Sequence, residues 1–75
     1  MKFYYPVELI DGRIQATFGY YSKRKNAENK INEIIAHNTV YKKIDDYVYL
    51  IRKLQFGNRD IDIIVKIIEG NIDDI

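Results

Sequence analysis

The residues that could do covalent chemistry are few and badly placed for it. The chain has no cysteine, one histidine, His37, and one serine, Ser22. Both lie at the ends of a segment expected to be helical, where a rise of 1.5 Å per residue would keep them roughly 22 Å apart. Nucleophilic catalysis needs a base within hydrogen-bond reach of the nucleophile. The sequence therefore predicts a protein that is not an enzyme.

Carboxylates are more numerous, but their spacing does not predict a metal site. Pairs occur at Asp45-Asp46, Asp60-x-Asp62 and Asp73-Asp74. None has the spacing of a calcium-binding loop or a histidine close by. Aspartate is common in turns because its side chain bonds to the local backbone. We expect neither a metal nor another cofactor.

Basic side chains on the expected helix are candidates for contacts to phosphate groups. They are Lys23, Arg24, Lys25 and Lys30. Residues 13–59 hold ten basic residues against four acidic ones, whereas residues 60–75 hold five acidic residues against one lysine. Cations beside tyrosines are what single-strand binders use, although a net charge of +1 is low for such proteins. A nucleic-acid-binding protein is therefore one hypothesis, and a solvated helix face explains the same residues.

The first 21 residues are predicted to form a β-hairpin. Apolar and polar residues alternate on both sides of Asp11-Gly12, a dipeptide typical of a two-residue turn. The register that pairs Ile10 with Arg13 places four apolar pairs on one face: Leu9–Ile14, Val7–Ala16, Tyr5–Phe18 and Phe3–Tyr20. Pro6 lacks the N–H that this register needs, which predicts a bulge or a break there and an edge position for the first strand.

A helix is predicted to follow, beginning with Ser22 as its cap and ending near His37 and Asn38. Its apolar residues have the spacing of a single stripe along one side: Ala27, Ile31, Ile34 and Ile35. Asn38 is expected in the left-handed conformation that closes many helices. Such a stripe predicts packing against one face of a sheet.

Three strands are predicted in the remainder, over residues 40–44, 47–56 and 60–69, with turns at Asp45-Asp46 and Gly57-Asn58. The register that pairs Phe56 with Arg59 makes these cross-strand pairs: Leu54–Ile61, Leu50–Val65, Val48–Ile67, Lys53–Asp62 and Gln55–Asp60. Apolar side chains then meet apolar ones and opposite charges meet, which supports the register.

Together these elements predict a single α+β domain over residues 1–75, with the order ββαβββ and one helix packed on one face of an antiparallel sheet. The other face would carry tyrosines and isoleucines that nothing covers: Tyr47, Tyr49, Ile51, Ile64, Lys66 and Ile68. Tyrosine is enriched at binding surfaces, because it combines a large contact area with a polar tip.

The leading functional hypothesis is a small non-enzymatic module that docks this face, or an exposed strand edge, onto a larger protein. Ile, Lys, Tyr and Asn make up 35 of the 75 residues, which suggests an AT-rich genome. With the small size, this makes a phage or mobile-element inhibitor of a host defence system, of the anti-CRISPR kind, the concrete expectation. A homodimer in which the open face covers itself is the third hypothesis.

The lack of cysteine, of a leader and of a long apolar run predicts a soluble cytoplasmic protein without membrane contact.

Overall fold

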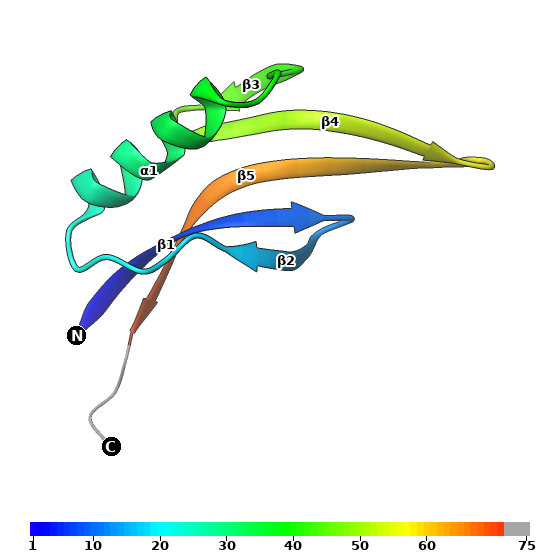
Figure 1. Ribbon diagram of the computed structural model, residues 1–75. Coiled ribbons are helices and arrows are strands. Elements are labelled where there is room, and N and C mark those ends of the chain that lie inside the picture. The colour runs from blue at the N-terminus through cyan, green and yellow to red at the C-terminus, as the bar shows by residue number, and fades with distance from the viewer. Residues whose placement is uncertain (72–75) are drawn as a thin grey trace.

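The computed structural model describes residues 1–71, and it joins five antiparallel strands in one sheet with one helix (Figure 1). The elements are β1 (Lys2–Ile10), β2 (Arg13–Thr17), α1 (Arg24–Ala36), β3 (Lys42–Asp45), β4 (Val48–Phe56) and β5 (Arg59–Asn71). This confirms the predicted α+β class and the order ββαβββ. The question of order at residues 72–75 lies outside the described residues.

β1 lies inside the sheet, and the predicted edge position is wrong. The strand order is β2-β1-β5-β4-β3, so β1 pairs with β2 on one side and with β5 on the other. The edges are the short strands β2 and β3. Alternation within a hairpin does not show what pairs with its outer side, and the long final strand β5 occupies that place along the whole of β1.

Pro6 lies where the ladder between β1 and β2 ends. β2 stops at Thr17, and beyond it the N–H of Phe18 donates to the Pro6 carbonyl oxygen at 2.8 Å. Gln15 is an extra residue in β2 that shifts the register. The observed pairs are Ile10–Arg13, Leu9–Ile14, Glu8–Ala16 and Val7–Thr17. The irregularity and the pairs beside the turn are confirmed, whereas the other predicted pairs of this hairpin are wrong.

A second bulge changes the register between β4 and β5. The pairs nearest Gly57-Asn58 are as predicted, including Lys53 with Asp62. Ile51 is then an extra residue, because Arg52 lies opposite Ile63 while Leu50 lies opposite Ile64. The predicted pairs Leu50–Val65 and Val48–Ile67 are therefore wrong. Counted from the Gly57-Asn58 turn, the bulge moves every side chain of β4 beyond Ile51 to the other face relative to β5.

The turn between β3 and β4 is displaced by one residue from its predicted place. Asp46 and Tyr47 form it, whereas the prediction put Tyr47 in the strand. Tyr47 has φ 57°, in the left-handed region that a bulky residue rarely adopts. Its side chain therefore projects from a turn and does not follow the alternation of β4.

The helix begins at Arg24, which is one residue later than it would begin if Ser22 were the cap. Lys23 occupies the cap position without a side-chain bond, so the predicted cap is wrong. At the other end, the side-chain amide of Asn38 donates to the Ile34 carbonyl oxygen at 2.7 Å. This bond closes the helix, and Asn38 does not adopt the predicted left-handed conformation.

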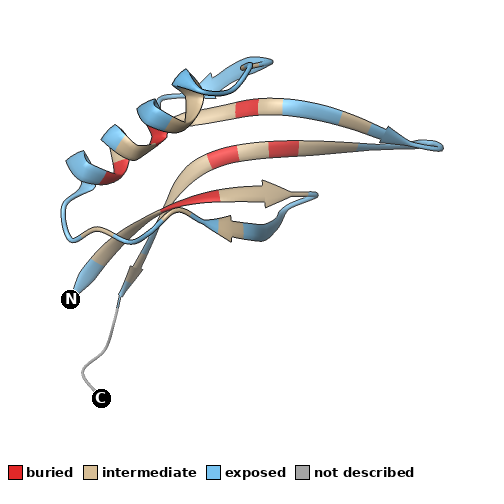
Figure 2. Ribbon diagram, in the orientation of Figure 1, coloured by how far each residue is buried: buried red, intermediate tan, exposed pale blue. Residues whose placement is uncertain are grey.

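One face of the sheet, the helix face, packs against α1, with Ala27 and Ile31 of the helix fully buried. Strand alternation puts Ile63, Val65 and Glu69 on this face, and Glu69 reaches Arg24 of α1. Figure 2 shows buried residues on α1, β1, β4 and β5, whereas the tip of the β4–β5 hairpin is exposed. The core is small, and the β4–β5 hairpin extends beyond the helix without cover (Figure 1).

Candidate functional site

The opposite side of the sheet, which we name the open face, carries side chains from three adjacent strands. Cross-strand pairing places them together, because residues directly opposite in an antiparallel ladder point to the same side. The set comprises Phe3, Tyr5, Val7 and Leu9 of β1, Ile64, Lys66 and Ile68 of β5, and Leu50 of β4. No helix among residues 1–71 covers this face.

The bulge at Ile51 divides the predicted tyrosine and isoleucine set. Ile64, Lys66 and Ile68 stay together on the open face, as predicted. Tyr49 lies opposite Val65 and therefore on the helix face, and Tyr47 lies in a turn. Ile51 lines a cavity beside the end of α1. Half of the predicted set therefore remains on one surface.

β1 contributes a row of side chains to the open face that was not part of the predicted set. Tyr5 lies opposite Ile68, and Leu9 lies opposite Ile64. Alternation correctly predicted that the odd residues of β1 share a face. It could not predict which face, because the even residues of β1 include the buried Pro6 and the half-buried Ile10.

Aromatic rings cover one end of the open face. The Tyr20 ring lies 5.7 Å from that of Phe3, edge to face, and 6.2 Å from that of Tyr5, measured between centroids. Tyr5 also lies against Gly70, where a Cβ would come within 2.8 Å of the tyrosine Cε2. Tyr20 nevertheless stays 64% exposed. The rings are therefore held by each other while one of them remains available to a partner.

Burial on the open face is uneven. Val7 and Leu50 are 1% and 6% exposed although no helix of residues 1–71 lies over them. The flanking residues Leu9, Ile64 and Ile68 are half-buried. Lys66 is the one charged group of the set, and it lies directly opposite Val7. Lys66 therefore lies among apolar side chains, and cross-strand pairing places Lys42, Lys53 and Asp62 on the same side of the sheet, toward β3 and the β4–β5 turn.

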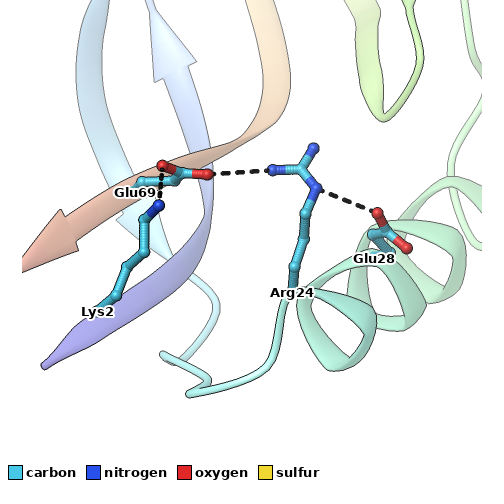
Figure 3. A network of polar contacts seen from close by, with 4 residues as sticks. All are labelled: Lys2, Arg24, Glu28 and Glu69. Atoms are coloured by element: carbon cyan, nitrogen blue, oxygen red, sulfur yellow. Dashed lines mark hydrogen bonds and ion pairs between the residues drawn. The ribbon is translucent and has the colours of Figure 1, made fainter.

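The four helix cations do not act as one basic patch. Arg24 lies 3.1 Å from Glu28 and 3.8 Å from Glu69, and Lys2 approaches the other oxygen of Glu69 at 3.1 Å (Figure 3). Lys30 pairs with Glu33 at 3.3 Å. Within residues 1–71, Lys23 and Lys25 are exposed and have no ion pair. Two of the four candidates therefore have their charge balanced by nearby carboxylates.

The ion pairs also act on the lysines. The hydrogen bond from Lys2 to Glu69 raises the pKa of Lys2 above its ordinary value of 10.5. The hydrogen bond to Asp46 raises the pKa of Lys43 in the same direction. The side chains of both lysines are about half exposed, at 53% and 55%, and both stay charged at neutral pH. No acid or base with a pKa shifted toward neutrality results from these contacts.

A cavity of about 370 Å³ lies between the end of α1 and the helix face. Glu8 and Arg52 are its charged residues, beside Asn38, Thr39 and three isoleucines. Its lining residues include no histidine. The arrangement offers room for a small polar group or a partner side chain.

Within the described residues, no group of three histidine or acidic side chains is placed to hold a metal ion. One oxygen of Asp62 is buried without a hydrogen-bond partner, although Lys53 lies on the opposite strand. The helix in residues 1–71 is not of the length and apolarity that crossing a bilayer requires. Asp73-Asp74 lies outside the described residues.

Comparison with protein-family models, with curated proteins and with solved structures finds no match to this chain. The open face, the strand edges and the charges around them are the features of residues 1–71 from which a function can be inferred.

Proposed function

We propose that this chain is a non-enzymatic protein-binding module that docks its open face onto a larger protein. The observation that carries the proposal is the apolar surface across β1, β5 and β4, which no helix covers in residues 1–71. Contiguous apolar surface on a small domain marks interaction sites. A phage or mobile-element inhibitor of a host defence system, the concrete form that size and composition suggest, would act by such docking.

The chemistry of the open face defines the partner surface that would fit it. Ile64 and Ile68 flank Lys66 along one strand, and the rings of Tyr5 and Tyr20 lie at one end. An apolar partner surface with one acidic group would bury the isoleucines and pair with the ammonium group. Large aromatic and apolar anchors at the centre of an interface supply most of its binding energy.

A pull-down with matched variants tests the proposal. The double variant Ile64→Lys/Ile68→Lys places two further charges on the open face. Ile44→Lys makes the same kind of change on β3, where Ile44 is 50% exposed. Circular dichroism and thermal unfolding check that both variants fold. We expect a cellular protein that the parent chain and Ile44→Lys retain equally, and that the double variant retains at least tenfold more weakly.

Equal retention by both folded variants, or no retained protein at all, would refute docking through the open face.

The nucleic-acid hypothesis is checked on the same material by fluorescence anisotropy with labelled single- and double-stranded DNA and RNA. Binding that falls steeply with salt, and that is lost in Lys23→Glu/Lys25→Glu, would favour that hypothesis. Of the four basic candidates, these are the two that have no ion pair within residues 1–71.

A further inference from the structure

The outer side of β4 is only half occupied. β3 pairs with β4 across Val48–Leu50, whereas β4 continues to Phe56. Within residues 1–71, no strand pairs with the outer side of residues 52–56. Figure 1 shows this part of the hairpin projecting beyond β3 and α1. It is a free edge of five residues that contains no proline, and the bulge at Ile51 lies just before it.

The backbone groups at this edge point outward at two residues. Phe56 and Arg59 flank the two-residue turn Gly57-Asn58, so they form the hydrogen-bonded pair that closes the hairpin. Alternation along β4 then directs the N–H and C=O of Lys53 and Gln55 away from β5. Neither residue takes part in a backbone hydrogen bond with a turn or loop of residues 1–71.

The sequence along the free edge, Arg-Lys-Leu-Gln-Phe, is complementary to itself when it is paired antiparallel about Leu54. Lys53 then lies opposite Gln55 of a second copy, and both residues use their outward backbone groups. Leu54 meets Leu54 at a position where side chains approach closely. Arg52 lies opposite Phe56, over whose ring a guanidinium group is stabilised.

Two neighbouring registers are less favourable. An antiparallel pairing centred on Lys53 puts two ammonium groups opposite each other, and one centred on Arg52 does the same with two guanidinium groups. Like charges directly opposite destabilise a ladder. The register about Leu54 avoids both contacts, and Phe56, which is 63% exposed in the single chain, gains cover.

We infer that two copies of this chain associate edge to edge through residues 52–56 of β4, antiparallel and centred on Leu54. The two-fold axis is perpendicular to the sheet, because paired side chains point to the same side. The dimer therefore presents both open faces on one surface. Five residues per copy form an interface below the standard size, so the association is weak and depends on concentration.

Charge variants at Gln55 test the register. In the dimer, residue 55 lies opposite Lys53 of the second copy, whereas within one chain it lies opposite Asp60. Gln55→Glu should tighten dimerisation and Gln55→Lys should weaken it, each by about 2- to 30-fold through two symmetric pairs. The stability of the single chain should change in the opposite direction, because residue 55 lies opposite Asp60 there: Gln55→Glu should destabilise the fold and Gln55→Lys should stabilise it. A folding defect therefore cannot imitate the expected pattern.

Sedimentation equilibrium from about 10 μM to 1 mM measures the dissociation constant. Gln55→Pro is the second variant, since it removes an outward N–H without removing a bond to β5. We expect the parent chain to dimerise and Gln55→Pro to stay monomeric. A monomeric parent chain at 1 mM, or dimerisation that Gln55→Pro leaves unchanged, overturns the inference. The variant Ile64→Lys/Ile68→Lys distinguishes the edge from the open face. If this variant still dimerises, the contact does not use the open face. If it folds but no longer dimerises, the contact lies on the open face and the inference is wrong.

Discussion

The contact between Gly70 and Tyr5 gives the sharpest prediction about stability. Gly70 lies in β5, and a Cβ at this position would be 2.8 Å from Cε2 of the Tyr5 ring. Carbon atoms in ordinary contact lie about 3.5–4.0 Å apart, so the ring would have to move by about 1 Å. The Tyr20 ring, 6.2 Å away between centroids, already packs beside it.

The expected cost of Gly70→Ala follows from two opposing terms. Overpacking a filled site costs about 1–3 kcal/mol. Replacing a glycine by alanine in an ordinary strand conformation returns about 0.4–1 kcal/mol, because the unfolded chain loses freedom. The net destabilisation is therefore about 1–2 kcal/mol, which lowers the melting temperature of a domain of this size by roughly 5–15 °C.

A double-mutant cycle separates the clash from other effects of the alanine. Urea unfolding is measured for the parent chain, Gly70→Ala, Tyr5→Ala and the double variant. In the Tyr5→Ala background the clash is absent, so Gly70→Ala should be neutral or stabilising. Tyr5→Phe is the matched control, since it keeps the ring and should keep the cost. Equal destabilisation by Gly70→Ala in the presence and absence of the ring would refute the argument.

Two further predictions concern the turn before β4 and the exposed ion pairs. Tyr47 has φ 57°, so Tyr47→Gly should be more stable than Tyr47→Ala by about 1 kcal/mol in thermal unfolding, whereas at Tyr49 in β4 the alanine variant should be the more stable one. A more stable alanine variant at Tyr47 would show that the positive φ costs nothing. The pairs of Lys2 with Glu69 and of Lys43 with Asp46 raise the lysine pKa values above 10.5, so their contribution to stability should be complete below pH 10.5 and lost as the pH rises through the folded-state pKa. Lys2→Met should remove part of that alkaline dependence in a pH series of unfolding curves, and an unchanged series would contradict the assignment.

Local patterns in the sequence determined the elements and the tight turns. Asp11-Gly12 and Gly57-Asn58 lie between strands because glycine adopts positive φ without a steric cost, and both hairpins have the predicted pairs beside these turns. The apolar stripe of α1 was equally clear, and its residues Ala27 and Ile31 are fully buried. These signals depend on neighbours a few residues apart in the chain.

The composition of the open face was decided by the tertiary structure. The extra residues Gln15 and Ile51 move later side chains to the other face, and neither has a side chain that distinguishes it as a bulge. A register error of one residue was enough to place Tyr49 on the wrong side of the sheet. Periodicity of two predicts that alternate residues share a face, but it carries no information on which face α1 will cover.

The position of β1 shows the same limit at the level of topology. Its pairing with β2 is local and follows from the turn between them, whereas its pairing with β5 joins residues about sixty positions apart. Only the folded sheet brings Phe3 and Tyr5 beside Gly70 and Ile68. The sequence by itself thus determined which segments become strands, helix and turns, because those choices depend on local backbone conformation. The strand order, the bulges and the resulting surface depended on long-range packing, which no local pattern encodes.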